Sequence, residues 1–185
     1  MLIRQCCGAS GTLTSAIMNK PKVMPKKVEP ANSYQAKLAT PFALLGIRTD
    51  EDWLTDIEYL SLDTPPLAAQ NPLAGEVCKQ LQAYLVDPAF VFDLSLHIGG
   101  TTHQRKVWHT IQTIPCGTTR SYADIATQLH SAPRAVGQAC GANRFPIVIP
   151  CHRVIAKNGG LGGFMNASDG VPLVIKRWLL QHECN

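Results

Sequence analysis

The first half of the chain alternates apolar and polar residues in a way that predicts a small antiparallel sheet. The alternation favours strands over residues 35–47 and 53–62. Between them, residues 48–52 are rich in Asp, Glu and Thr, which is typical of the turn of a hairpin. A further strand is predicted over residues 90–96, where large apolar residues again alternate with smaller or polar ones.

A helix is predicted between the hairpin and the last of these strands. Asn71 precedes Pro72, the order expected for a helix N-cap followed by its first residue. From there to Tyr84 an apolar face repeats every four residues, at Leu73, Val77, Leu81 and Leu85. The glycines at 99 and 100 then end this part of the chain. We therefore expect a flexible arm over residues 1–33, an N-terminal unit over 34–96 and a C-terminal unit over 97–185.

The C-terminal unit has the pattern of short helices. Helical periodicity is present over residues 103–114, and further helices are predicted over 122–130 and 133–141. Ser121, followed three residues later by Asp124, is a variant of the capping box that begins a helix. Two helices joined by a two-residue turn indicate a helix-turn-helix, whose second helix meets nucleic acid.

That second helix carries an unusual number of small residues. Ala135, Ala139 and Ala142 are spaced to lie on one face, and Gly137 and Gly141 reduce its bulk further. Such a face allows a partner to approach the backbone closely. The pattern also fits tight packing against another helix, and from the helix alone both interpretations stay open.

Composition limits the class of protein. The chain has 185 residues, of which 45% are hydrophobic and 16% charged, which fits one globular domain or two small ones sharing a core and argues against disorder. No apolar run reaches the ~18 residues of a membrane-spanning helix, and residues 1–22 lack the pattern of a secretory signal. We therefore expect a cytoplasmic protein with no membrane contact.

The cysteines do not form a recognisable framework. There are seven, an odd number, and none of them is spaced as C-x-x-C. This argues against a set of disulfides and against a Cys-rich zinc site, so we expect neither a metal nor a cofactor.

Charge is divided unevenly along the chain. The formal net charge is +4 over residues 1–33, −6 over 34–96 and +6 over 97–185. The positive C-terminal unit predicts an anionic partner such as nucleic acid. The same distribution also fits a basic half that neutralises an acidic neighbour.

The chemistry of the chain is concentrated at Cys151, which follows a short apolar run bracketed by prolines. A single cysteine in such a place is often a small buried apolar residue. Here His152 and Arg153 follow directly, and positive side chains there could lower the pKa of the thiol. In an extended chain neighbouring side chains point apart, so we expect a water molecule to link His152 to Cys151.

The C-terminal unit carries an ordered set of short motifs: Ser121-Tyr122, Arg134-Ala135-Val136-Gly137, Asn143, Pro146, Pro150-Cys151-His152-Arg153-Val154, Gly162-Gly163-Phe164, Lys176-Arg177-Trp178-Leu179-Leu180 and His182-Glu183. Over about residues 97–183 this set resembles the O6-alkylguanine-DNA alkyltransferases. The resemblance implies an α+β fold. It consists of an N-terminal α/β domain with a small antiparallel, ribonuclease H-like sheet, and a mainly helical C-terminal domain containing a winged-helix-like helix-turn-helix.

The resemblance also implies how DNA is bound. The helix-turn-helix would enter the minor groove of double-stranded DNA, and Arg134 would take the place of the damaged nucleotide, which rotates out into a pocket. Ser121, Tyr122, Ala135 and Gly137 would lie against the DNA. Small residues suit a narrow groove, and extrusion is needed because the O6 substituent is shielded within the base stack.

By the same resemblance, Cys151 is the acceptor of an alkyl group from O6 of guanine, and of O4 of thymine, and keeps it as a thioether, so that each molecule acts once. His152 would act through water as the base for Cys151, and Glu183 would orient His152. Asn143 would brace the recognition helix against the cysteine loop. Tyr122 would donate a proton to N3 of guanine and so improve the leaving group.

The expected lining of the substrate pocket is Pro146, Val154, Phe164 and Met165. The chain departs from the family pattern after Phe164, because residues 165–175 form a longer loop and Met165 stands where the family usually has a serine. The preference among alkyl groups therefore stays open. Arg153 is expected to be structural or to face phosphate rather than to act in catalysis.

Two other classes of function compete with this one. A non-catalytic protein that binds alkylated DNA would keep the recognition helix, but it would not need Cys151. A Cys-His hydrolase would use Cys151 and His152, but it would leave Arg134 and Tyr122 without a role. We therefore expect a DNA alkyltransferase that acts as a monomer.

Overall fold

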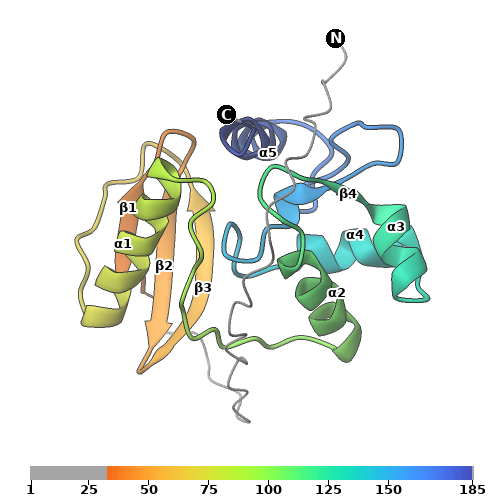
Figure 1. Cartoon of the computed structure of the whole chain (residues 1–185). Coiled ribbons are helices and arrows are strands. Elements are labelled where there is room, and N and C mark those ends of the chain that lie inside the picture. The colour runs from red at the N-terminus through yellow and green to blue at the C-terminus, as the bar shows by residue number, and fades with distance from the viewer. Residues whose placement is uncertain (1–32, 185) are drawn as a thin grey trace, which may run out of the picture.

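The computed structural model describes residues 33–184 and begins with a three-stranded antiparallel sheet (Figure 1). Its strands are β1 (Ala36–Ala39), β2 (Leu44–Asp50) and β3 (Trp53–Leu60), in the order β1-β2-β3. The predicted hairpin turn is confirmed between β2 and β3, where Glu51 has a positive φ of 48°. The arm predicted over residues 1–33 lies outside the described residues, apart from Ser33.

The single strand predicted over residues 35–47 is wrong, because the chain turns back on itself in the middle. The Thr40 hydroxyl donates to the carbonyl of Ala43 at 2.7 Å and accepts from the Ala43 amide at 3.2 Å. Pro41, which has no amide hydrogen for a sheet ladder, lies inside this turn. Together these residues separate β1 from β2.

The strand predicted over residues 90–96 is also wrong, since the segment forms one isolated bridge, between Leu96 and Leu54 of β3. A side chain takes the place of a neighbouring strand. The amide of Gln80 donates to the carbonyl of Asp93 at 3.1 Å and accepts from its backbone N–H at 2.9 Å. These two bonds satisfy the Asp93 backbone without a ladder.

The predicted helix after Asn71 is confirmed as α1 (Pro72–Val86). The Asn71 side chain accepts from the amide of Ala74 at 2.8 Å, so it caps the helix as expected. The apolar face of α1 is buried against the sheet, and Figure 1 shows the helix lying across it. Tyr84, near the end of α1, is almost completely buried.

The three helices predicted in the C-terminal unit are confirmed as α2 (Thr102–Gln112), α3 (Tyr122–Gln128) and α4 (Pro133–Gly141). The capping box at Ser121 is present with both of its hydrogen bonds to Asp124. Helices α3 and α4 pack together as the helix-turn-helix, and α2 packs on α4.

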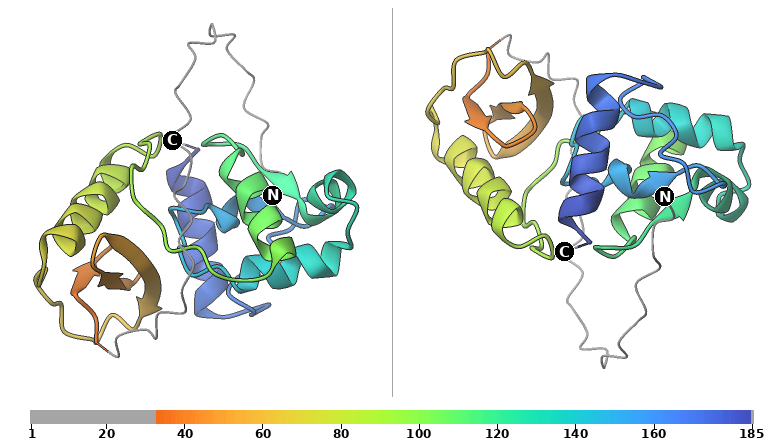
Figure 2. Two further views of the ribbon diagram at one scale, coloured as in Figure 1. Left: turned by 90° about the horizontal axis from the view of Figure 1, so that it is seen from below. Right: turned by 90° about the horizontal axis from the view of Figure 1, so that it is seen from above.

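After α4 the chain forms the 3-10 helix Cys151–Arg153, then β5 (Val154–Ile155), which pairs in parallel with β4 (Arg120–Ser121). The last element, α5 (Val171–His182), lies between the sheet with α1 and the other helices (Figure 2). Trp178 of α5 contacts Phe42 at a ring-centroid distance of 4.5 Å. The two units therefore share one apolar core, to which α5 contributes Ile175 and Leu179.

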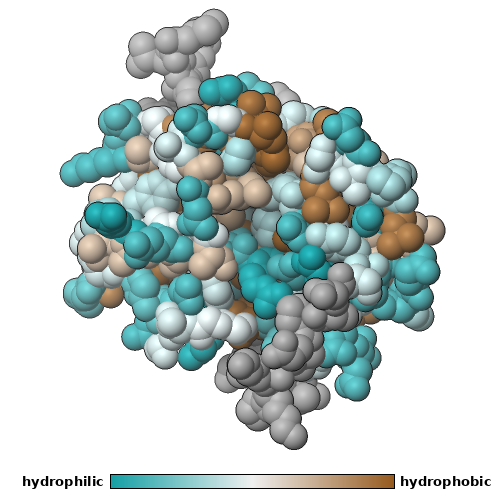
Figure 3. Space-filling model, turned by 180° about the vertical axis from the view of Figure 1, so that it is seen from behind, coloured by the Kyte–Doolittle hydropathy of each residue, from teal (hydrophilic) through white to brown (hydrophobic). Residues whose placement is uncertain are grey.

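The molecule is a mixed α/β protein with one small antiparallel sheet and five α-helices in the described part. No helix among residues 33–184 combines the length and the apolar character that crossing a membrane requires. The face shown in Figure 3 is mostly hydrophilic, and its hydrophobic residues form separate small groups. The boundary between the units at residue 97 stays a prediction.

The capping box makes Ser121 important for stability. We expect Ser121→Ala to lower the free energy of unfolding by about 1 kcal/mol and the melting temperature by about 2–4 °C, because the first turn of α3 loses its cap. Urea and thermal denaturation check this. Thr127→Ala on the same helix is the control, since its hydroxyl bonds only to the Ala123 carbonyl one turn earlier. Equal loss in both variants would contradict the role of the cap.

Candidate active site and DNA-binding helices

Cys151 lies at the first residue of the 3-10 helix, and its side chain is 4% exposed. The Asn143 amide nitrogen donates both to Cys151 Sγ at 3.3 Å and to the Ile149 carbonyl at 2.9 Å. Its amide oxygen accepts from the Phe145 N–H at 2.9 Å. Asn143 comes two residues after α4, so one side chain joins the end of this helix to the segment that carries the thiol.

The surroundings of Cys151 differ from the extended chain that we expected. Burial raises the pKa of the Cys151 thiol, while the hydrogen bond from Asn143 and the charge of Lys176 act in the opposite direction without cancelling it. The expected lowering by the side chains of His152 and Arg153 is therefore wrong. The Arg153 guanidinium turns away toward Glu183, and burial lowers the pKa of His152, which favours a neutral ring.

His152 and Glu183 form a buried pair, with 2.8 Å between Nε2 and Oε1. A carboxylate only accepts hydrogen bonds, so in the neutral ring Nε2 carries the hydrogen and Nδ1 is left as the acceptor. Nδ1 is buried and has no hydrogen-bond partner among the described residues. The pair therefore holds a neutral imidazole in one tautomer.

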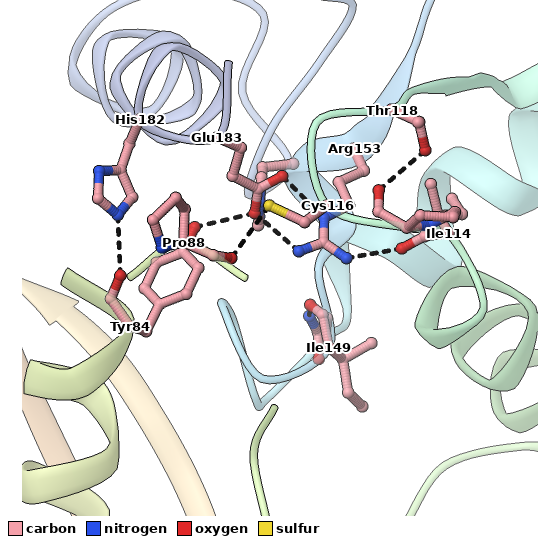
Figure 4. Close-up of polar contacts among 12 residues, drawn as sticks. Tyr84, Pro88, Ile114, Cys116, Thr118, Ile149, Arg153, His182 and Glu183 are labelled. Atoms are coloured by element: carbon pink, nitrogen blue, oxygen red, sulfur yellow. Dashed lines mark hydrogen bonds and ion pairs between the residues drawn. The ribbon is translucent and has the colours of Figure 1, made fainter. Parts of the chain in front are cut away.

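The carboxylate of Glu183 is the centre of a larger network (Figure 4). Its Oε1 also accepts from the Tyr84 hydroxyl at 2.9 Å and from Arg153 Nη2 at 2.8 Å, while Oε2 accepts from Arg153 Nε at 2.9 Å. Burial alone would raise the pKa of Glu183, but the hydrogen bonds from His152 and Arg153 outweigh it and lower the pKa to about 2.

Arg153 is held at both sides of its guanidinium. Besides the two bonds to Glu183, its Nη1 donates at 2.6 Å to the carbonyl of Ile114, two residues after the end of α2 (Figure 4). The bidentate pair fixes the orientation of the carboxylate. The expectation of a structural role fits these contacts, and none of them leaves the guanidinium free for phosphate.

Sequence reasoning missed the position of Lys176, on α5. Its side chain has no exposed surface, and its Nζ donates to the carbonyls of Val154, Leu161 and Gly163 at 2.6, 2.6 and 3.0 Å. Within residues 33–184 no carboxylate pairs with it, and burial lowers the pKa of Lys176 to about 8. The available signal was a lysine placed between Ile175 and Leu179 on an apolar helix face.

Tyr122 is the first residue of α3, and its hydroxyl donates to the Gly163 carbonyl at 2.8 Å. Lys176 Nζ lies 3.4 Å from the same hydroxyl oxygen. Burial raises the pKa of Tyr122. The phenol is thus protonated and placed beside a buried cation.

A cavity of about 600 Å³ extends from Cys151 to the surface. Phe164 and Met165 line it as expected, but Pro146 and Val154 are buried and do not belong to its lining. The remaining wall comes from both helices of the helix-turn-helix and the loop after Phe164: Tyr122, Pro133, Arg134, Gly137, Gln138, Cys140, Gly141, Gly163, Asn166, Ala167 and Ser168.

The small residues of α4 include some that pack against another helix and some that leave the surface open to a partner. Ala139 is buried, and its carbonyl accepts from the Trp108 indole at 2.8 Å, so packing explains that position. Exposed Arg134 and small Gly137 line the cavity instead. Ala135 is half-buried. Ser121 is buried with its hydroxyl on Asp124, so the structure gives it a capping contact.

The longer loop after Phe164 forms a tight turn at the edge of the cavity. Met165 and Asn166 both have positive φ angles, 52° and 60°, and the backbones of Phe164 and Ala167 exchange two hydrogen bonds of 2.9 Å across them. This is the two-residue hairpin geometry with both central residues left-handed. The Asn166 amide donates to the carbonyl of Gly141 at 3.1 Å and so fixes the turn to the end of α4.

A buried cysteine with a histidine-carboxylate pair behind it, at the end of a cavity bordered by a helix-turn-helix, defines a DNA-binding protein with a nucleophilic thiol. Residues 102–185 match the family model described as 6-O-methylguanine DNA methyltransferase, DNA binding domain. The methylated-DNA–protein-cysteine methyltransferase of Shigella flexneri is 38% identical over 168 residues, which cover 80% of this chain and 94% of that protein. The constitutive enzyme of the same name from Bacillus subtilis is 37% identical over 161 residues, covering 82% and 95%.

A crystal structure of Mycobacterium tuberculosis OGT in complex with DNA is similar in fold, with a TM-score of 0.68 and 35% identity over 80% of this chain and 91% of that one. These matches cover the N-terminal unit as well as the site. The chain belongs to the methylated-DNA–protein-cysteine methyltransferase family.

The unusual burial of Lys176 gives a prediction for stability against pH. Its pKa is lower in the folded chain than in the unfolded chain, so between about pH 8 and pH 10 the unfolded chain binds more protons and stability rises with pH. We compare the unfolding free energies of the natural protein and of Lys176→Met. From pH 8 to pH 9 their difference should change by about 1 kcal/mol in favour of the natural protein. Urea denaturation of both proteins checks this, and a constant difference would contradict it.

Proposed function

We propose that this DNA-repair alkyltransferase moves the alkyl group of O6-alkylguanine in double-stranded DNA to Sγ of its own Cys151. The observation that carries the proposal is the position of Cys151, at the inner end of a cavity that the recognition helix α4 borders. In the transfer, the bond from O6 to the alkyl carbon breaks and a bond from Sγ to that carbon forms. The product is a thioether, which has no simple route back to the thiol, so each molecule acts once.

The thiol needs a base because burial raises its pKa. His152 is the candidate, since a neutral ring with Nδ1 unprotonated can accept a proton. We infer that the proton of Cys151 reaches Nδ1 through a water molecule, as no direct hydrogen bond joins the two side chains in the described residues. Glu183 then stabilises the imidazolium that forms, which is the role of the carboxylate in hydrolytic triads.

Tyr122 is proposed to help the leaving group. Loss of the alkyl group leaves negative charge on guanine, and protonation at N3 would reduce it. The Tyr122 hydroxyl lies at the cavity wall and now donates to the Gly163 carbonyl, an interaction that it would exchange for N3 of the base. Lys176, at 3.4 Å, would stabilise the oxygen as its proton leaves.

Helix α4 is proposed to bind the minor groove, with Arg134 replacing the extruded nucleotide. Arg134 is exposed at the cavity, so a base rotated out past it would meet the opening that leads to Cys151. Gly137 and half-buried Ala135 keep the neighbouring surface low, as a narrow groove requires. Ser121 would contribute by placing Tyr122 beside the DNA.

The cavity also bears on the range of substrates. Met165 is 38% exposed and stands at the cavity edge on its tight turn, so a larger substituent than methyl would contact it. Because the cavity has a volume of about 600 Å³ and is open at this edge, we infer that the enzyme accepts groups larger than methyl, and O4-alkylthymine in addition to O6-alkylguanine.

Finer features of the fold are proposed with the function. The small antiparallel sheet with α1 across it supports a ribonuclease H-like N-terminal domain over residues 34–96. The helix-turn-helix with the short β4-β5 pair beside it supports a winged-helix-like domain over 97–185. We propose that the protein acts as a monomer, because the described residues of one chain supply both the lining of the cavity and the network around Glu183. A cytoplasmic location is proposed on the sequence alone.

A non-catalytic lesion-binding protein is the second candidate. Such a protein would also have the recognition helix and a pocket for an extruded base, so these features do not distinguish binding from alkyl transfer. The thiol, Asn143 and the His152–Glu183 pair favour transfer, because binding alone needs none of them.

The identity of the acceptor can be tested by mass spectrometry after mixing the protein with duplex DNA containing O6-methylguanine. We expect a mass increase of one methyl group, located on the peptide that contains Cys151. Cys151→Ala is expected to show no increase and to keep its DNA affinity within a few fold, because phosphate contacts dominate affinity. Cys78→Ala on α1 is the control and should react fully. A methylated Cys151→Ala protein would contradict the assignment.

The role of Arg134 can be tested by comparing duplex DNA with free O6-benzylguanine, which needs no extrusion. We expect Arg134→Ala to slow transfer from duplex DNA at least about tenfold and to change transfer from the free base less than about twofold. Arg177→Ala, which removes an exposed charge from α5 away from the cavity, is the matched control. Equal losses on both substrates in Arg134→Ala would show that the arginine does not assist extrusion.

A further inference from the structure

Tyr84 connects the N-terminal unit to the carboxylate behind the candidate base. It lies near the end of α1, 99 residues before Glu183, and its hydroxyl donates to Glu183 Oε1 at 2.9 Å (Figure 4). The side chain is 1% exposed. The sequence pattern places this tyrosine at the end of a predicted helix, and the structure adds a hydrogen bond to the Glu183 carboxylate.

The contact is one of several that hold Tyr84 in place. The backbone carbonyl of Tyr84 accepts from His182 Nε2 at 2.8 Å, so consecutive residues at the end of α5 bind both ends of the same tyrosine (Figure 4). The ring of Tyr84 also meets the His182 ring edge-on, with 5.3 Å between centroids, and the Phe92 ring at 5.8 Å. The hydroxyl therefore has little freedom to leave Glu183.

Tyr84 and His152 share one acceptor atom. Oε1 of Glu183 accepts from Tyr84, from His152 and from Arg153, whereas Oε2 accepts from Arg153 alone. A donor on Oε1 withdraws part of the negative charge that would otherwise act on the imidazole. Removing that donor would leave more of the charge facing His152.

We propose that Tyr84 is a positioning residue through which the N-terminal unit sets the position and charge of the Glu183 carboxylate that holds His152. The inference rests on the proposed function, because it assumes that His152 is the base for Cys151. It assigns the N-terminal unit a part in the reaction, although the cysteine, the base and the recognition helix all belong to the C-terminal unit.

Without the phenol hydroxyl, the Glu183 carboxylate stabilises the protonated imidazole more strongly, so the pKa of His152 rises. A protonated His152 cannot accept the proton of Cys151. The acidic limb of the pH-rate profile should therefore move to higher pH.

The experiment measures single-turnover transfer from free O6-benzylguanine to Cys151 in the full-length protein over about pH 4.5 to 8.5, which removes any contribution of DNA binding. In Tyr84→Phe we expect the acidic midpoint to rise by about half a pH unit, and the rate on that limb to fall about threefold. Phe42→Leu is the matched control, because it weakens the contact between the units at Trp178 without touching Glu183. It should lose stability and keep the midpoint.

A second substitution gives the opposite sign and leaves the ring in place. Incorporation of 3-fluorotyrosine at position 84 makes the phenol a stronger donor, so the midpoint should fall. It also keeps the test informative if Tyr84→Phe does not fold. An unchanged midpoint in both proteins, or an equal shift in Phe42→Leu, would overturn the proposal.

Introducing Tyr84→Phe into a Glu183→Gln protein separates an effect through the Glu183 charge from a general structural effect. In that protein Tyr84→Phe should not lower the rate further, because the charge that Tyr84 regulates is absent. Full additivity of the two losses would overturn the proposal. Failure of the natural protein to become alkylated at Cys151 would instead overturn the proposed function, so the two results are distinguishable.

Discussion

The rest of the site depends on the buried carboxylate of Glu183. Removing a carboxylate from water costs several kcal/mol unless each of its oxygens accepts good hydrogen bonds. Here the donors come from α1 and from the 3-10 helix, and the carboxylate itself directly follows α5. Meeting this requirement draws the two units together around the end of α5. The same contacts fix the ring of His152 in one tautomer, so that the stability of the interface and the chemistry of the thiol rest on one group.

A second buried charge, Lys176, acts on the other side of the thiol. Its ammonium group binds carbonyls instead of a carboxylate, so its positive charge acts on the Cys151 thiol and on the Tyr122 hydroxyl. Burial keeps Cys151 protonated in the free protein, while Asn143 and Lys176 stabilise the thiolate once a base takes the proton. We infer that the thiol is unreactive toward solvent and becomes a nucleophile within the cavity.

Local signals predicted four of the five helices, α1 to α4, and two of these begin with caps that form as the sequence indicates, at Asn71 and at the Ser121–Asp124 box. Helix α5 was not predicted, and its N-cap Gly170 makes no side-chain hydrogen bond. The strand errors also have local causes that periodicity does not contain, namely the Thr40 turn and the Gln80 amide. The contacts of Asn143 with Cys151 and of Glu183 with His152 agree with what the family resemblance implied. Pro146 and Val154, by contrast, do not line the cavity. The sequence did not reveal that Tyr84 donates to Glu183 or that Lys176 is buried among backbone carbonyls. These contacts join segments far apart in the chain, and no local periodicity or motif indicates them.

The central claim is that Glu183 holds His152 as a neutral ring whose Nδ1 is free to accept the proton of Cys151. The most direct test is the measurement of the nitrogen-15 chemical shifts of the His152 ring by NMR at neutral pH in the unreacted protein. The account predicts a neutral ring with the hydrogen on Nε2 and an unprotonated Nδ1. A doubly protonated ring, or the hydrogen on Nδ1, would contradict it, because neither form can accept a proton at the nitrogen that faces away from Glu183.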